Sequence, residues 1–249
     1  MSRLQNRIAW ITGAGTGIGR GIAVALAEAG MNVALSGRRQ APLDEVAEVI
    51  RSMGREAVVL PIDVMDREGI QNTVKAIEES LGEIWLLVNN AGMNTTQRMA
   101  IDMAPEDWDA VVDVNLTGAF NCFRGVFAAM KSREQGMVIN IASMAGRQIS
   151  LLGGAAYTAS KHAMVALTHS INLEAAAFGI RASVICPGEV DTPILAVRPN
   201  PVSAKRQSLM LKPEDLGATV AFVAQTPPHV TIPELWILPT YQVSADPLP

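Results

Sequence analysis

Short apolar runs alternate along this chain with longer segments in which apolar residues recur every three or four positions. The runs RIAWIT at 7–12 and NVALSG at 32–37 have the length and composition of buried strands. Segments 17–28 and 41–53 have helical periodicity and are closely followed by glycine, which commonly ends a helix. The pattern therefore predicts strands and helices in alternation from residue 7 onward.

The alternation continues almost to the last dozen residues, without a repeat, a low-complexity segment or a linker. Helices between strands imply right-handed crossovers, which build a parallel sheet with helices on both faces. We therefore expect one doubly wound α/β domain of the Rossmann type over residues 1–249. Further strands are expected at 56–63, 84–90, 136–143, 180–186 and 234–238, and further helices ending at Gly82, spanning 104–131 and 155–178, and beginning near Lys212.

The turn after the first predicted strand is rich in glycine. Ligands of doubly wound sheets bind beyond the carboxyl ends of the strands, and the sequence there is TGAGTGIG. Glycines allow the backbone to approach a pyrophosphate, whose charge is stabilised by the free N–H groups at a helix N-terminus. The spacing is G-x-x-x-G-x-G, and a flexible turn is the simpler alternative. The cofactor-binding residues predicted here are Gly13, Gly15, Thr16, Gly17, Ile18 and Gly19.

The end of the second predicted strand indicates which dinucleotide is bound. A carboxylate there commonly binds the ribose 2′-hydroxyl of NAD(H), but this chain has Gly37 followed by Arg38 and Arg39. Guanidinium groups match a 2′-phosphate, so the sequence favours NADP(H) over NAD(H), with a solvated turn as the alternative. Asp63 and Val64, after the third strand, are expected near the adenine, although Asp63 is almost equally well explained as a turn former.

One of the two tyrosines, Tyr157, lies in the sequence YTASK, fourteen residues after Ser143. If a helix begins near Ala155, Lys161 is one turn from Tyr157 on the same face. A nearby ammonium stabilises a phenolate, so Lys161 is expected to lower the pKa of Tyr157 from its ordinary value near 10. Such a phenol exchanges protons near neutral pH and is a candidate general acid and base.

Composition mainly excludes other classes of function. Apolar residues make up 49% of the chain, which suits a sheet buried on both faces. The longest apolar runs are far shorter than the about 18 residues of a membrane span, and no signal peptide is visible, so a cytoplasmic protein is expected. A net charge of -4 with scattered basic residues argues against nucleic acid and anionic lipid. Cys122 and Cys186 are expected in the core, and without a Cys/His cluster no metal site is predicted.

Several short motifs together resemble one protein family. TGAGTGIG, NNAG, VNLTG, a serine thirteen residues before AYTASK, and PGEVDT follow one another in the order of the short-chain dehydrogenase/reductase family. The chain is similar to the one-domain branch of this family from about residue 6 to 240. Each motif is weak by itself, but the ordered set is specific.

The resemblance implies roles for individual residues. Tyr157 would be the catalytic acid and base, Ser143 would polarise the substrate carbonyl, and Lys161 would also bind the nicotinamide ribose. Asn115, within VNLTG, resembles the residue that fixes a water in the proton relay behind the lysine. Further cofactor contacts are implied for Asn90, Ala91, Gly92, Pro187, Gly188, Val190 and Thr192.

The expected activity is hydride transfer between a nicotinamide cofactor, NADPH being favoured, and a small carbonyl or alcohol substrate. An NAD-dependent alcohol dehydrogenase, a 3-oxoacyl reductase and, more remotely, a non-catalytic nucleotide sensor remain alternatives. Similar proteins commonly pair their long helices across a two-fold axis, so a homotetramer or homodimer is expected.

Substrate selection is expected to depend on a loop at about 193–211 and on residues around the serine. Four apolar residues there would form an adaptable pocket. The loop cations are explained either by solvation or by an anionic substrate. The apolar residues are Met144, Ile149, Leu151 and Leu152, and the cations are Arg198, Lys205 and Arg206.

Overall fold

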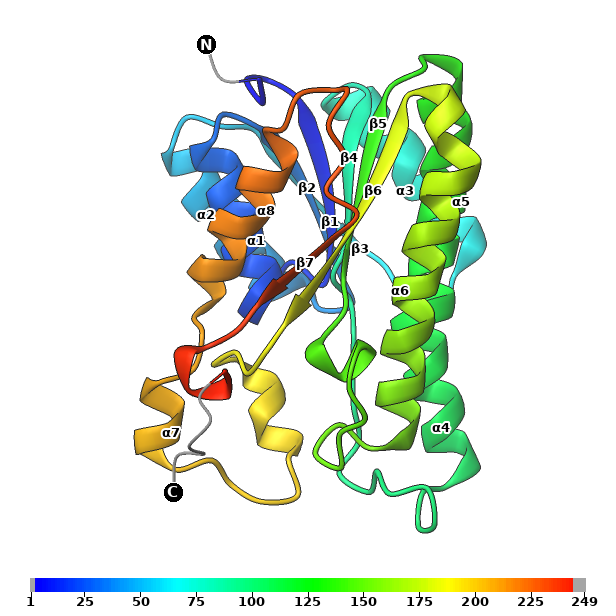
Figure 1. Cartoon of the computed structure of the whole chain (residues 1–249). Coiled ribbons are helices and arrows are strands. Elements are labelled where there is room, and N and C mark those ends of the chain that lie inside the picture. Colours follow the sequence, from blue (N-terminus) through cyan, green and yellow to red (C-terminus); the bar gives the residue numbers. More distant parts are fainter. Residues whose placement is uncertain (1–2, 244–249) are drawn as a thin grey trace.

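All strands of the computed structural model, which describes residues 3–243, lie in one parallel sheet of order β3-β2-β1-β4-β5-β6-β7. Helices cover both of its faces (Figure 1), so the fold is the predicted Rossmann-type α/β domain. The first two and last six residues of the predicted domain lie outside the described range. The strands are β1 (Ile8–Thr12), β2 (Asn32–Gly37), β3 (Ala57–Pro61), β4 (Ile84–Asn89), β5 (Gly136–Ile141), β6 (Ile180–Pro187) and β7 (Glu234–Ile237).

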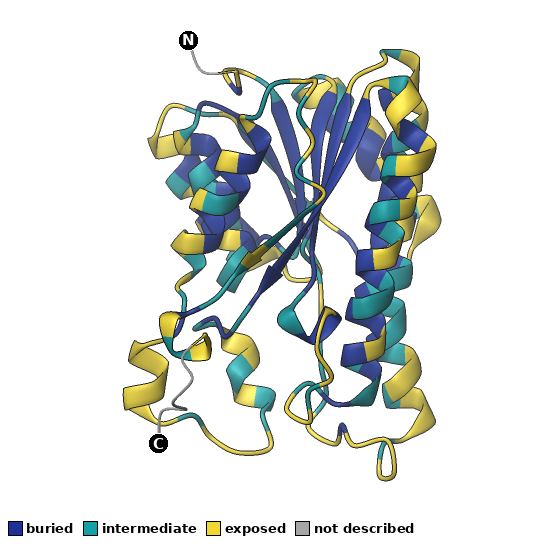
Figure 2. Ribbon diagram, viewed as in Figure 1, coloured by how far each residue is buried: buried dark blue, intermediate teal, exposed yellow. Residues whose placement is uncertain are grey.

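The central strands are buried on both faces, which explains their continuous apolar runs (Figure 2). Successive side chains of a strand point to opposite faces, so neighbours in sequence belong to different cores. In β1, Ile11 packs into one hydrophobic cluster and Trp10 into the other. The Trp10 indole is satisfied in the interior because it donates to Ser36 Oγ at 2.9 Å.

One face of the sheet is covered by α1 (Gly17–Glu28), α2 (Gln40–Ser52) and α8 (Pro213–Ala224), as Figure 1 shows. The other face carries α3 (Arg67–Ser80), α5 (Gly118–Ser132) and α6 (Ala155–Ala175), with α4 (Pro105–Val112) beyond the sheet. Most predicted boundaries agree with these bounds to within two residues, which is the usual spread of helix and strand ends.

Two predicted segments differ from the structure. The helix expected over 104–131 is interrupted between α4 and α5 by a π-helical turn at Asp113–Thr117. The loop expected at 193–211 contains a 3-10 helix at Pro193–Val197 and the short α7 at Ala204–Ser208. Single π turns inserted into helices are often associated with functional sites.

The strand order places the candidate site. The chain proceeds outward from β1 through β2 to β3 and then returns to β4 on the other side of β1. At such a reversal the connections leave the sheet in opposite directions and open a crevice beyond the carboxyl ends of the strands. The glycine turn after β1 and the NNAG turn after β4 therefore lie next to each other.

Candidate active site

A cleft of about 410 Å³ opens beyond the carboxyl ends of β1, β4, β5 and β6. This volume is within the range of roughly 300–1,000 Å³ that is typical of small-molecule sites. Many of the residues predicted from sequence line it, from five separate segments of the chain. The predicted catalytic and cofactor-binding residues that line the cleft are Gly13, Thr16, Gly17, Ile18, Asn90, Ala91, Gly92, Ser143, Tyr157, Lys161, Pro187, Gly188, Val190 and Thr192.

The glycine turn needs the conformational freedom of glycine. Gly13 and Gly17 have φ values of 63° and 52°, in the left-handed region. A Cβ on Gly19 would overlap the carbonyl oxygen of Gly13, so any side chain there would push the turn apart. The backbone at the N-terminus of α1 is thus open to an anionic group, and the turn fits a dinucleotide pyrophosphate.

The NNAG turn is fastened to the glycine turn by hydrogen bonds. The Asn90 amide donates to the carbonyl oxygens of Thr12 and Gly13 at 3.0 and 3.1 Å. The hydroxyl of Thr12 accepts from the backbone N–H groups of Asn90 and Ala91, both at 3.1 Å. These contacts give NNAG a structural role in addition to the cofactor contact expected of it.

Ser143, Tyr157 and Lys161 meet in the cleft. Ser143 follows β5 and caps a 3-10 turn at Met144–Gly146, where its Oγ accepts from Ala145 N at 3.1 Å. Tyr157, in the first turn of α6, lines the same cleft, where the Ser143 hydroxyl acts to lower the pKa of the phenol. Lys161 is on the same face of α6, with Nζ 5.6 Å from the centroid of the Tyr157 ring. The structure thus brings together the predicted acid/base, its serine and its lysine.

Burial dominates the ionisation of both Tyr157 and Lys161. It raises the pKa of Tyr157 above its ordinary value, against the lowering effects of the Ser143 hydrogen bond and of the charges of Arg98 and Arg198. It lowers the pKa of Lys161 to about 8, although the ammonium donates to the Ile141 carbonyl at 2.9 Å. The pKa of Tyr157 is therefore raised and not lowered as predicted, because desolvation of the half-buried phenol outweighs the nearby charges.

Asn115 lies behind Lys161, in the π-helical turn, and is fully buried. Its side-chain oxygen accepts from Met93 N at 2.7 Å, and its amide donates to Met93 O at 3.0 Å and to Ser160 Oγ at 3.2 Å. A Cβ on Gly92 would lie 3.3 Å from the Asn115 oxygen and 3.6 Å from Lys161 Nζ. Asn115 therefore connects the NNAG segment to α6, and its role in a proton relay stays a prediction.

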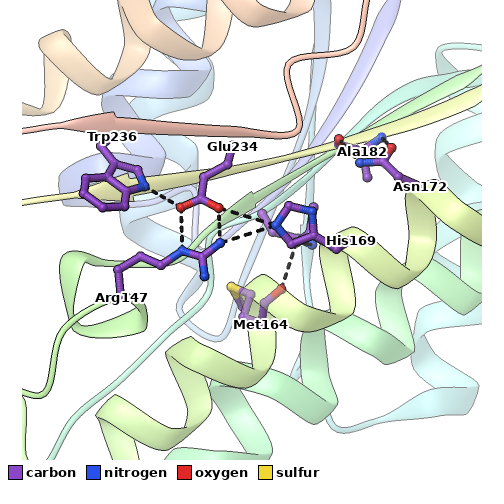
Figure 3. A network of polar contacts seen from close by, with 9 residues as sticks. Arg147, Met164, His169, Asn172, Ala182, Glu234 and Trp236 are labelled. Atoms are coloured by element: carbon purple, nitrogen blue, oxygen red, sulfur yellow. Dashed lines mark hydrogen bonds and ion pairs between the residues drawn. The ribbon is translucent and has the colours of Figure 1, made fainter.

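The turn that carries Ser143 is held on two sides. A Cβ on Gly146 would lie 2.7 Å from the Lys161 carbonyl oxygen, so glycine allows the turn to approach α6 closely. Arg147, at the end of the turn, forms a bidentate ion pair with Glu234 of β7. Figure 3 shows His169 of α6 and Trp236 of β7 against the same carboxylate. Arg147 lowers the pKa of Glu234 to about 2, chiefly by hydrogen bonding.

The residues predicted to bind the adenosine half, and Gly15 of the glycine turn, lie outside the cleft lining. Arg38 and Arg39 are exposed where β2 leads into α2, and Asp63 is exposed with its carboxylate accepting from Met65 N at 3.0 Å. Val64 is buried, and Gly15 faces Pro42, whose Cβ would lie 3.0 Å from an added Cβ. Their cofactor contacts stay predictions.

The sequence reasoning missed Glu189, which directly follows Pro187 and Gly188. Its carboxylate is buried and pairs with Arg198 and Arg206, each at 2.9 Å, and it also accepts from the Tyr241 hydroxyl. Its backbone N–H donates to Gln242 Oε1 at 2.8 Å. Glu189 thus joins the 193–211 loop to the segment after β7, and its position at the end of a strand was a signal that could have revealed it.

Arg98 was also missed. Its side chain lines the cleft and is 5% exposed, and its guanidinium donates to the carbonyl oxygens of Leu152, at 2.8 Å, and Val197. The Arg98 carbonyl accepts from Ala155 N at 3.0 Å, at the start of α6. No periodic pattern marks a buried arginine between NNAG and α4, so the sequence carries no signal for it.

The substrate end of the cleft is more polar than predicted. Met144 and Leu152 line it, but Ile149 and Leu151 are 85% and 76% exposed and lie outside it. The prediction of an apolar pocket from these four residues is therefore wrong in part, because the chain turns two of them toward solvent. Polar side chains take part in the lining instead, including Asn94, Gln148, Ser150 and Gln242.

Comparison with known proteins places this geometry in a family. The profile of the family described as short chain dehydrogenase matches residues 7–201. An uncharacterized oxidoreductase of Staphylococcus aureus (strain MRSA252) is 32% identical over 240 residues, which cover 96% of this chain and all of that protein. An uncharacterized oxidoreductase of Staphylococcus saprophyticus is 34% identical over 241 residues, again 96% of this chain and all of the relative.

Crystal structures of other proteins are also similar. An alcohol dehydrogenase from the archaeon Thermococcus sibiricus, complexed with 5-hydroxy-NADP, has a TM-score of 0.85 at 28% identity, covering 96% of this chain and 99% of its own. A metagenomic short-chain oxidoreductase in complex with NADP has a TM-score of 0.82 at 30% identity, covering 95% and 98%.

The chain belongs to the short-chain dehydrogenase/reductase family. It is an NAD(P)-dependent oxidoreductase, with the single Rossmann-type domain that the sequence predicts. Within residues 3–243 no helix is long and apolar enough to cross a membrane. The same residues contain no group of three or more His, Cys, Asp or Glu side chains that could hold a metal ion.

Proposed function

We propose that the protein reduces a small carbonyl compound with NADPH, or oxidises the corresponding alcohol with NADP⁺. The observation that carries the proposal is that Tyr157, Ser143 and Lys161 line one cleft together with the glycine turn. A substrate oxygen accepting from both hydroxyls would be polarised by two donors in a largely water-excluded site. Bound NADP(H) would supply or accept the hydride.

Tyr157 is proposed to exchange the proton of the substrate oxygen. Because burial keeps its pKa raised, the phenol is protonated at neutral pH and ready to act as an acid, which suits carbonyl reduction. Lys161, with a pKa near 8, is the stronger acid of the two and can return a proton to the tyrosinate. Asn115 is proposed to hold this relay in place through Met93 and Ser160.

The preference for NADP(H) is supported by the charge at the end of β2. Arg38 and Arg39 are exposed at the edge next to the glycine turn, where a ribose 2′-phosphate would find two guanidinium groups and no carboxylate from Gly37. The NADP cofactors of the two similar crystal structures support the same choice. An NAD-dependent alcohol dehydrogenase of the same fold is the alternative.

Replacing Tyr157 by Phe tests the reaction. The variant keeps the ring but loses the proton, so kcat should fall by about 100-fold or more, as removal of a general acid commonly does. Binding of NADPH, followed by the change in its fluorescence, should stay within about twofold, because the glycine turn is untouched. Near-normal turnover of Tyr157→Phe, with any ketone that the wild type reduces, contradicts the proposed mechanism.

Replacing Arg38 by Asp tests the cofactor. The wild type should have a higher kcat/KM for NADPH than for NADH, by about 10-fold or more if the guanidinium binds the 2′-phosphate. Arg38→Asp should reduce or reverse that ratio, because a carboxylate repels the phosphate and can accept from a ribose hydroxyl. A wild type that prefers NADH, with no response to the substitution, would identify the alternative.

A further inference from the structure

Two guanidinium groups share the cleft with Tyr157. Arg98 and Arg198 both line the cleft together with Tyr157. The charges of both act on the Tyr157 hydroxyl, and the charge of Arg198 disfavours that of Arg98. Like charges held together in a cleft raise the local concentration of anions and attract an anionic ligand.

These positive charges are poorly compensated. Glu189 is the carboxylate that pairs with Arg198, and it is shared with Arg206. No carboxylate within residues 3–243 forms an ion pair with Arg98, whose guanidinium donates to two backbone carbonyls instead. Arg198 and Arg206 therefore share one carboxylate while Arg98 has none, so the excess charge is positive.

One N–H donor of the Arg98 guanidinium has no hydrogen-bond partner in the described part of the chain. Arg98 is only 5% exposed. The unpaired donor is its Nε, which is itself buried. Buried donors are nearly always paired, and an unpaired one calls for an explanation. The Arg98 side chain also lines the cleft, so this N–H is unpaired at the edge of the site, and it would gain a partner only from a group that enters beside the guanidinium.

We propose, on the basis of the proposed reaction, that the substrate is an oxo acid or hydroxy acid whose carboxylate binds between Arg98 and Arg198 while its carbonyl or hydroxyl oxygen faces Tyr157 and Ser143. Arginine suits this task because its planar fork matches a carboxylate. The polar lining, with Asn94, Gln148 and Ser150, fits such a ligand better than a purely apolar ketone. Tyr157 would then act close to the substrate carboxylate, whose negative charge the two arginines would offset.

Binding can be measured apart from turnover. The enzyme saturated with NADP⁺ cannot reduce a ketone, so binding can be measured by calorimetry without turnover. Comparing each acid with its methyl ester reports recognition of the carboxylate alone, and the acids are 2-oxobutanoate, 3-oxobutanoate and 4-oxopentanoate. At least one acid should bind about 10-fold or more tightly than its ester, as expected for a charge-assisted bidentate contact. If no acid is preferred, including the case in which none of the compounds binds, the inference is overturned.

Two arginine substitutions form a matched pair. Arg198→Gln and Arg206→Gln each remove one guanidinium from Glu189, but only Arg198 lines the cleft, and Arg206 is half exposed. Arg198→Gln should reduce the preference for the acid by about fivefold or more, while Arg206→Gln should leave it within about twofold, since solvent screens an exposed charge. Equal effects of the two substitutions would mean that general charge or loop attachment, and not a carboxylate site, causes the preference.

Arg98 needs a conservative change because it also binds the carbonyls of Leu152 and Val197. Arg98→Lys keeps the charge but loses the fork, so the preference for the acid should fall by about threefold or more while the esters bind as before. Unchanged preference in a folded Arg98→Lys variant contradicts the role given to its Nε. Initial rates of NADPH consumption with the same compounds then test the reaction separately. Acids that bind selectively without reacting would refute the proposed reduction of these compounds but would still support the anion site.

Discussion

At the scale of single residues, the site holds two ionisable groups away from bulk water, with Lys161 buried and Tyr157 half-buried. Burial favours the neutral form of each, which raises the pKa of the phenol of Tyr157 and lowers that of the amine of Lys161 to about 8. Lys161 therefore carries its charge at neutral pH at a cost in stability. Its hydrogen bond to the Ile141 carbonyl offsets only part of that cost.

Replacing Lys161 by Met should reveal this cost. The folded-state pKa is below the unfolded value near 10.5, so the unfolded chain binds more protons between about pH 8 and 10.5 and stability rises with pH in that window. Relative to Lys161→Met, the wild type should gain roughly 3 kcal/mol across the window, because each pKa unit corresponds to about 1.4 kcal/mol. Urea unfolding of both proteins at several pH values measures the difference, and a difference that does not vary with pH would show that Lys161 ionises normally.

Some residues of the site were predictable and others were not. Tyr157 and Lys161 share a helix, so their proximity follows from local spacing, and Ser143 could be placed because it follows a strand. Arg98 is buried only because carbonyls from two distant segments converge on its guanidinium, and such convergence leaves no trace in sequence. The raised pKa of Tyr157 was missed for the same reason, since the degree of burial is a tertiary property.

At the scale of elements, the turn after β5 is positioned by its neighbours more than by its own sequence. Gly146 allows it to approach α6 at Lys161, and the Arg147–Glu234 ion pair attaches it to β7 (Figure 3). Ser143 begins this turn, so the distance between serine and lysine depends on contacts made several residues away.

Arg147→Gln should destabilise the protein in a way that depends on pH. Arg147 holds the pKa of Glu234 near 2, below the unfolded value near 4.5, so the pair stabilises the fold above about pH 4.5 and loses its effect as pH falls toward 2. A loss of about 1 kcal/mol in unfolding free energy is expected at pH 7 for a partly exposed bidentate pair. Denaturation at pH 7 and pH 3 measures it, and the loss should be smaller at pH 3.

The exposed pair of Lys75 and Glu79 on α3 provides the comparison. Its atoms are 3.8 Å apart and both side chains are mostly exposed, so Lys75→Gln should change stability little at either pH. A pH-independent loss in Arg147→Gln, similar to that of Lys75→Gln, would contradict the stabilising role of the Arg147 network.

Elements with a strong pattern were predicted well. The apolar runs of β1 and β2 and the helix N-terminal to Gly30 have clear lengths and end signals, and the structure has them where expected. The π-helical turn at Asp113–Thr117 was missed because one extra residue hardly disturbs a helical pattern in a segment that is apolar on several sides. This turn carries the buried Asn115, so the relay role proposed for Asn115 depends on it.

At the scale of the whole molecule, several large apolar side chains remain at the surface. Leu173 on α6 is 88% exposed, Phe120 on α5 is 42% exposed, and Phe222 on α8 is 60% exposed. Exposed apolar side chains of this kind commonly belong to subunit contacts, so the expectation of a homotetramer or homodimer stays a prediction with physical support. The polar cleft is distinct from these residues.

Glu189 has two structural roles at once, and this affects how the substrate site could be redesigned. The carboxylate that fastens the 193–211 segment is the same one that orients Arg198 in the cleft. If Arg198 binds the substrate carboxylate as proposed, replacing it to admit uncharged ketones would also remove one of the two ion pairs of Glu189 and weaken the attachment of the 193–211 segment. Broader selectivity would therefore require a compensating neutral residue at position 189, selected together with the arginine change.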